Sequence, residues 1–247
     1  AAAAPLPDFS QWGEIERASM SKVRQITAER LSQAWSTIPM VTQFDKADVS
    51  DLEVWRKEHG KRAEAAGGKL TPTAILIKVL GAALKVFPQF NASFDESSGQ
   101  LILKKYHHMG IAVDTESGLM VPVIRDVGDK SLLEIAIELN EMAEKARDRK
   151  VTVDDMKGSS FTISNLGGLG VGAFTPIVNA PDVAILGLGR GQLKPHFDNN
   201  NKMSPRLMMP VCLSYDHRVI DGADGARFVM QIKQEFESFA ESELKEI

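Results

Sequence analysis

The chain has 247 residues, of which 43% are hydrophobic and 25% charged, a composition typical of a folded globular protein rather than a disordered one. Its 29 basic and 33 acidic residues give a net charge of −4, so no basic excess indicates binding to nucleic acid or to an anionic membrane surface. The one cysteine, Cys212, excludes an intramolecular disulfide framework and a thiol metal cluster, and no apolar run is long enough to span a membrane.

The chain opens on Ala-Ala-Ala-Ala-Pro-Leu-Pro and lacks the basic region and apolar core of a secretory signal. Runs of alanine and proline are typical of an extended, semi-rigid linker. We therefore expect residues 1–12 to be the end of a linker and residues 13–247 to form one domain.

The first half of the chain alternates between helical and strand patterns. Apolar residues at helical spacing predict a helix over residues 19–36, followed by a strand over residues 41–49. Ser50 and Glu53 have the spacing of a capping box and predict a helix over residues 50–66. Thr71 and Pro72 predict the start of the next helix, which should run to Phe87. Short strand patterns follow over residues 101–103, 108–113 and 119–124.

The second half contains a long helix, several strands and a C-terminal helix. Ser131 and Glu134 form a second capping-box pattern, and the helix they open should end near the basic residues around Lys150. The predicted strands are residues 161–164, 183–188 and 207–215, and the predicted last helix is residues 222–239. These elements predict a single mixed α/β domain with a large sheet.

The strongest local motif is residues 214–222, Ser-Tyr-Asp-His-Arg-Val-Ile-Asp-Gly. An apolar strand ends at His217, and histidine is the side chain best suited to act as a base near neutral pH. Asp221 follows four residues later and could brace the histidine or neutralise a nearby cation. From the pattern alone, a structural histidine and an Asp N-cap explain the residues equally well.

A second motif is residues 161–170, Phe-Thr-Ile-Ser-Asn-Leu-Gly-Gly-Leu-Gly. Here a strand brings the hydroxyl of Ser164 to a flexible loop, where it could stabilise an oxyanion. By itself, the pattern is explained more simply by a glycine-rich turn. The glycines fit neither a dinucleotide fingerprint nor a phosphate-binding loop. Cys212 lies among apolar residues and is expected to be a buried, inert thiol, and the neighbours of His107 and His108 do not indicate a metal site.

Together, residues 216–222 and 161–164 resemble the catalytic domain of the dihydrolipoyl acyltransferases, the core components of the 2-oxo-acid dehydrogenase complexes. The resemblance extends from about Gly13 to the C-terminal helix and includes residues 90–93, 118–123 and 175–179. Ser164 favours the pyruvate-type, acetyl-transferring branch, because succinyl-type members often have threonine there.

The resemblance implies a fold like that of chloramphenicol acetyltransferase, an α+β sandwich in which helices flank a mixed sheet. It also implies a trimer whose active site lies in a channel between two subunits. Coenzyme A, a substrate, would enter from one end, and a lipoyl group carried on a separate domain from the other. The family's catalytic base falls on His217, its motif carboxylate on Asp221 and its oxyanion donor on Ser164. Arg56 matches an arginine that pairs with the motif aspartate in the wider fold, and a solvated position on a charged helix is the alternative.

The resemblance further implies a homotrimer or a cubic 24-mer. Members that form such cages often end in a bulky apolar tail, whereas residues 241–247 are mostly charged and offer only Leu244 and Ile247 as apolar anchors. The expected partners are lipoyl domains and the 2-oxo-acid dehydrogenase and dihydrolipoyl dehydrogenase components, with no nucleic acid and no membrane. The expected location is cytoplasmic, with the mitochondrial matrix as the alternative.

Three alternatives to acetyl transfer stay open on the sequence. The acyl group could be succinyl or branched-chain. The chain could be a free-standing acetyltransferase for a small alcohol, although its linker-like start argues against this. It could also be a non-catalytic scaffold, although the joint presence of His217, Asp221 and Ser164 argues against that.

Overall fold

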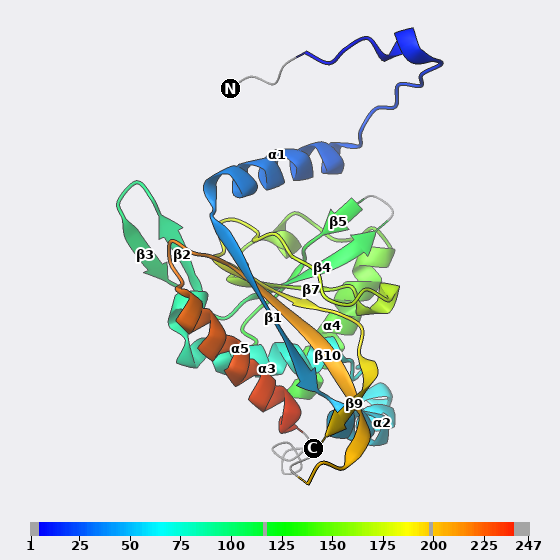
Figure 1. Cartoon of the computed structure of the whole chain (residues 1–247), viewed down its shortest axis with the longest axis vertical. Coiled ribbons are helices and arrows are strands. Elements are labelled where there is room, and N and C mark those ends of the chain that lie inside the picture. The colour runs from blue at the N-terminus through cyan, green and yellow to red at the C-terminus, as the bar shows by residue number, and fades with distance from the viewer. Residues whose placement is uncertain (1–4, 116–117, 198–199, 240–247) are drawn as a thin grey trace.

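An eight-stranded mixed sheet forms the centre of the molecule (Figure 1). The structure is a computed structural model that describes residues 5–115, 118–197 and 200–239. In order across the sheet, the strands are β1 (Met40–Asp48), β10 (Met203–Asp216), β8 (Ala184–Leu188), β7 (Phe161–Asn165), β4 (Met109–Thr115) and β5 (Gly118–Met120), with β6 (Val123–Ile124) paired to β4 and β9 (Gln192–Phe197) paired to β10. Strand β7 is parallel to β4 and β8, whereas β10 is antiparallel to β1 and β8. The expected mixed sheet is confirmed.

Three helices cover one face of this sheet (Figure 1). They are α5 (Gly222–Glu237) beside β1, α3 (Pro72–Val86) in the middle, and α4 (Leu132–Arg147) beside β4. The remaining long helices are α1 (Lys22–Thr37) and α2 (Ser50–Ala65), and β2 (Ala92–Asp95) and β3 (Gln100–Leu103) form a separate hairpin. Short 3₁₀ turns occupy Phe9–Trp12, Pro88–Phe90, Asp154–Met156 and Gly167–Leu169.

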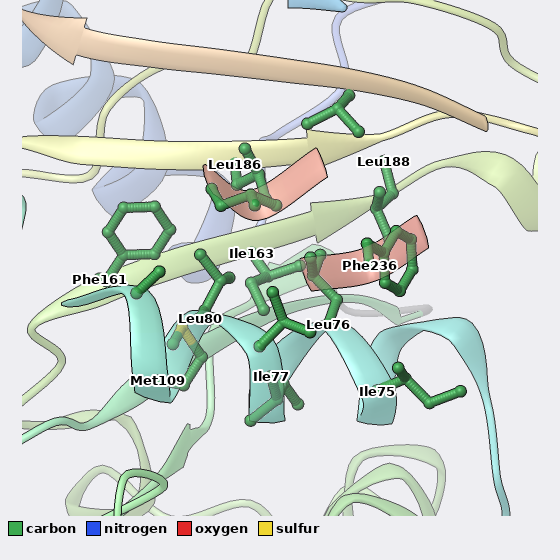
Figure 2. Packing of buried hydrophobic residues seen from close by; sticks show 14 of the residues in the cluster. Ile75, Leu76, Ile77, Leu80, Met109, Phe161, Ile163, Leu186, Leu188 and Phe236 are labelled. Atoms are coloured by element: carbon green, nitrogen blue, oxygen red, sulfur yellow. The ribbon is translucent and has the colours of Figure 1, made fainter. Parts of the chain in front are cut away.

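Helix α3 is the central element of the core. Thr71 caps it by accepting a hydrogen bond from the Ala74 N–H at 3.1 Å, and Pro72 occupies the first turn, as predicted. Its fully buried side chains face the core-side residues of β7 and β8; Figure 2 labels Ile75, Leu76, Ile77, Leu80, Phe161, Ile163, Leu186 and Leu188. Because side chains alternate along a strand, Ser164 points to the opposite, open face of the sheet.

One predicted capping box is confirmed and the other is wrong. At α4, Ser131 Oγ accepts from the Glu134 N–H, and the Glu134 carboxylate accepts from the Ser131 N–H. At α2, the helix begins at Ser50 itself, and its hydroxyl donates to Asp48 and accepts from the Leu207 N–H at 2.7 Å. The hydroxyl of Ser50 is engaged by the neighbouring strand, so it does not cap the helix.

Two strands were not predicted. Strand β2 completes the hairpin with β3, and β9 is exposed along its whole length and contains Pro195, so it lacks an apolar pattern. The helices of the described ranges are too short or too polar to cross a bilayer. Residues 1–4 of the expected linker and the charged tail, including Leu244 and Ile247, lie outside the described residues.

Candidate active site

His217 lies in the turn between β10 and α5. The strand is buried over residues 211–216, and the chain becomes exposed at His217 itself. The His217 N–H donates to the Pro39 carbonyl at 3.1 Å, and the N–H groups of Val219 and Ile220 both donate to the Asp216 carbonyl at 3.0 Å. The backbone of this turn is therefore held on both sides of the histidine, while the residue itself is accessible in the single chain.

The residues on either side of His217 form an ion pair between a buried carboxylate and a partly exposed guanidinium. Arg218 donates to the Asp216 carboxylate from Nε at 3.0 Å and from Nη2 at 2.7 Å, and the Asp216 side chain is only 3% exposed. Arg218 also donates from Nη1 to Glu96, beyond the end of β2, at 3.2 Å, and its guanidinium lies 5.1 Å from the centroid of the Phe94 ring. Paired hydrogen bonds between a guanidinium and a carboxylate fix geometry strongly. Both residues belong to the motif of residues 214–222, but no role was predicted for either; an Asp-x-Arg spacing around a histidine was the available signal.

Asp221 occupies the N-cap position of α5. Its carbonyl accepts from the Gly225 N–H at 2.9 Å, but its carboxylate makes no capping hydrogen bond. Its negative charge is nevertheless favourable at a helix N-terminus. Burial and, secondarily, the charge of Asp221 raise the pKa of Tyr215, whose ring centroid lies 6.0 Å from that of His217. Asp221 and His217 therefore lie around the same buried tyrosine.

Ser164 lies half-buried on the open face of β7. It is the register partner of Ala112 on β4 and of Gly187 on β8. Asn165 is engaged in structural contacts: its amide donates to Thr73 and its oxygen accepts from the Gly167 N–H, both at 2.8 Å. Because the Asn165 side chain is already engaged, Ser164 is the one of these two side chains that is suited to donate to a substrate.

The glycine-rich loop that follows Ser164 packs backbone against backbone. A Cβ on Gly189 would lie 2.0 Å from the Gly172 carbonyl oxygen, and one on Gly167 would lie 3.0 Å from the Gly189 carbonyl oxygen. At Gly189 only glycine allows so close an approach, whereas at Gly167 a side chain would fit tightly. The glycines of this loop therefore serve its close backbone packing, which is the simpler explanation of the motif.

His217 and Ser164 of one chain are far apart. Ser164 pairs with Gly187, which pairs with Cys212 on β10, five residues before His217. Two strand spacings and five residues of rise correspond to roughly 15–20 Å between the two Cα atoms. Side chains of this length cannot bridge that gap, so one chain alone does not bring the expected base and oxyanion donor together.

The comparison with known families decides the identity of the fold. Residues 13–244 match the family model described as the 2-oxoacid dehydrogenases acyltransferase catalytic domain. The chain belongs to this acyltransferase family. The resemblance inferred from the motifs is confirmed.

Known relatives of this acyltransferase domain include curated and solved proteins. This chain is 48% identical over 227 residues to the Haemophilus influenzae dihydrolipoyllysine-residue acetyltransferase component of pyruvate dehydrogenase complex. The match covers 91% of this chain and 40% of that protein. Two solved structures match with TM-score 0.93 at 47% identity, covering 97% of this chain and 98% of theirs: Azotobacter vinelandii dihydrolipoamide acetyltransferase and the cubic core of the pyruvate dehydrogenase multienzyme complex. Chloramphenicol acetyltransferase matches at 14% identity with TM-score 0.51, which confirms the expected fold.

Arg56 does not pair with Asp221 within this acyltransferase chain. Arg56 donates from Nε and Nη2 to Glu53 at 2.7 and 2.8 Å, and from Nη1 to the Leu70 carbonyl at 2.9 Å. Helix α2 contacts Phe239, just past the end of α5, whereas Asp221 precedes the start of that 16-residue helix. The two ends of α5 are about 24 Å apart. Arg56 therefore ties α2 to the segment before α3.

Cys212 is buried, as predicted, and burial raises the pKa of its thiol. A thiol held in its protonated form is a poor nucleophile, which favours the structural role predicted for it. No cluster of three or more His, Cys, Asp or Glu side chains suited to a metal ion occurs in the described part of the chain.

His108 gives this acyltransferase domain a pH-dependent stability. Its Nδ1 accepts a hydrogen bond from the Asp126 N–H at 3.0 Å, which requires an unprotonated nitrogen, and burial lowers its pKa. Below about pH 6.5, where an unfolded histidine takes up its proton, the unfolded state binds more protons than the folded state, so stability falls as the pH falls.

We expect urea unfolding to show a lower free energy of unfolding at about pH 5.5 than at about pH 7.5. The difference between the two pH values should be smaller in His108→Asn. Burial also lowers the pKa of His107, so a residual dependence should persist. Equal pH dependence in parent and variant would contradict this assignment.

Proposed function

We propose that this domain transfers an acetyl group between S-acetyldihydrolipoamide and coenzyme A, as the core of a pyruvate dehydrogenase-type complex. The chain spans about 40% of the length of the Haemophilus relative, whose name states this activity and complex. The observation that carries the proposal is His217, accessible on a turn that the Asp216–Arg218 ion pair holds in place.

The role of Asp221 is supported by a relative. The Azotobacter structure is described as an investigation of a serine, a histidine and an asparagine in the catalytic mechanism, and that histidine and asparagine are four positions apart. His217 and Asp221 have the same spacing. An asparagine amide takes up no proton near neutral pH, so we assign Asp221 to positioning rather than to proton transfer.

The proposed reaction needs only a base and an oxyanion donor. His217 takes the proton from the coenzyme A thiol as its sulfur forms a bond to the acetyl carbonyl carbon, because a thiol near pKa 8.5 is mostly protonated at neutral pH. The Ser164 hydroxyl donates to the resulting oxyanion. The bond from carbon to the dihydrolipoamide sulfur then breaks, and the imidazolium returns its proton to that sulfur. Acetyl-coenzyme A and dihydrolipoamide are the products.

The site is completed by a second copy of the chain. The separation of roughly 15–20 Å between His217 and Ser164 within one chain supports a site in which each comes from a different subunit of a symmetric oligomer. One solved relative is the cubic core of the pyruvate dehydrogenase complex. We propose that this chain likewise forms a homotrimeric core. Its partners would be lipoyl domains and the 2-oxo-acid dehydrogenase and dihydrolipoyl dehydrogenase components.

A rate comparison tests the proposal. The assembled protein is given acetyl-, succinyl- or isobutyryl-coenzyme A with dihydrolipoamide, and formation of the new thioester is followed. We expect acetyl transfer to have the highest kcat/KM and a small alcohol to be a poor acceptor. Absence of transfer to dihydrolipoamide, or a preference for the hydroxyl acceptor, would contradict the proposal.

A further inference from the structure

Phe174 lies over the same face of the sheet as Ser164, above the neighbouring strand. A Cβ built on Gly187 would be 2.8 Å from Cζ of Phe174 and 3.2 Å from Cε1 and Cε2, so the tip of the ring occupies the space that a side chain at Gly187 would fill. Gly187 is the register partner of Ser164 on the adjacent strand. Strands are spaced about 4.8 Å apart, so the ring tip stands over a position one strand away from Ser164.

The start of the segment that carries Phe174 is fixed to the sheet. The backbone of Phe174 faces the thiol of Cys212, the next residue of the same row, on β10, and acts to lower the pKa of that thiol against the effect of burial. The Arg190 N–H donates to the Val171 carbonyl at 2.6 Å. The aromatic side chain therefore extends from above β10 to the space over Gly187 on β8, the strand next to β7.

The far end of the same segment is anchored by a buried charge. Asp182 accepts from Lys104 Nζ at 3.1 Å, from Ser159 Oγ at 2.7 Å and from Thr162 Oγ1 at 3.2 Å. The side chains of Asp182 and Lys104 are 1% and 8% exposed. Such a satisfied, buried network holds its members in one arrangement. Val178 of this segment is also fully buried against the sheet. Residues 171–182 thus present the Phe174 ring on a backbone held at both ends.

The space around Ser164 is consequently asymmetric. On the β8 side it meets the phenyl ring of Phe174 above Gly187, and on the β4 side its register partner is Ala112, which contributes a single methyl group. If the Ser164 hydroxyl donates to the oxyanion at about 3 Å, the acyl carbon lies close above this row of residues. An acyl chain that extends toward β8 beyond its first carbon then meets the ring.

We infer that Phe174 limits the length of the acyl group that this site transfers, an inference that rests on the proposed function. The ring leaves room for the methyl group of an acetyl thioester and obstructs longer chains. Pockets discriminate between substrates that differ by a methylene group by about 10- to 200-fold.

The test compares Phe174→Leu and Phe174→Met with Phe44→Leu in the assembled protein. Phe44 is the matched control: it belongs to the same row on the same face, 54% exposed, but is three strands away from Ser164, about 14 Å. For each protein, kcat/KM is measured with acetyl- and butyryl-coenzyme A as donors and dihydrolipoamide as acceptor. We expect the butyryl-to-acetyl ratio to rise about 10-fold or more in both Phe174 variants and to stay at the parent value in Phe44→Leu.

The outcomes separate this inference from the proposed function. If the parent protein transfers no acyl group, the proposed function fails. If the parent transfers acetyl groups but the ratio is unchanged in the Phe174 variants, or rises equally in Phe44→Leu, only the inference is overturned. Loss of all transfer in both folded Phe174 variants would also overturn it, because removing an obstruction should admit longer chains rather than abolish the reaction.

Discussion

Replacing His217 by alanine should lower kcat for acetyl transfer by about 10²–10⁴-fold, the range typical of a lost general base. The thiol of coenzyme A would then have to lose its proton to water during attack, and the departing sulfur would lack a proton donor. The turn should persist, because its hydrogen bonds come from backbone groups and from the Asp216–Arg218 pair rather than from the imidazole. Steady-state kinetics with acetyl-coenzyme A and dihydrolipoamide measure the effect.

His196→Ala provides the matched control for that variant. His196 is exposed on β9, away from the β10–α5 turn, so its loss should leave kcat unchanged. Thermal unfolding and sedimentation should be alike in both variants and in the parent. Near-normal turnover of a correctly assembled His217→Ala protein would reject His217 as the base.

Replacing Ser164 by alanine should lower kcat by about 10²–10³-fold and leave KM nearly unchanged. The hydroxyl is assigned to the charge that develops only in the transition state, so its removal should affect turnover rather than substrate binding. Its side chain is half-buried on an open sheet face, and alanine fits the same strand position without a new contact.

The Ser164→Thr variant distinguishes the contribution of the hydroxyl group from that of side-chain packing at this position. Threonine keeps an oxygen at the same position and should retain much of the activity that alanine loses. An equal loss in Ser164→Thr and Ser164→Ala would point to packing rather than to hydrogen bonding. A rise in KM at constant kcat would show that Ser164 binds the ground state.

The sequence predicted the elements whose signal is local. Helix α3 follows from its cap and its apolar length, and the capping box at Ser131 needs only residues close by in the chain. The histidine turn likewise follows from an apolar strand that ends in polar residues and glycine. Where a side chain has a distant partner, local patterns fail: Ser50 bonds to Leu207, and Arg56 bonds to Leu70.

The sequence predicts the individual residues of the site but not how they are arranged in space. His217 and Ser164 lie in motifs, but their separation in one chain follows from the strand register across β7, β8 and β10, which no motif encodes. The contact of Arg218 with Glu96 joins residues from distant segments, and the Phe174 ring lies over β8, next to the strand of Ser164, only because Gly187 leaves space there. These features depend on tertiary packing.

Mixed oligomers test most directly whether the base and the oxyanion donor act together across two subunits. His217→Ala and Ser164→Ala chains, each nearly inactive alone, are coexpressed in equal amounts and purified as mixed assemblies. A shared site is intact when its histidine comes from a Ser164→Ala chain and its serine comes from a His217→Ala chain. Each of these conditions holds for half of the chains. Random mixing should therefore restore about one quarter of wild-type activity. Activity no higher than the average of the two separate variants would contradict the shared site.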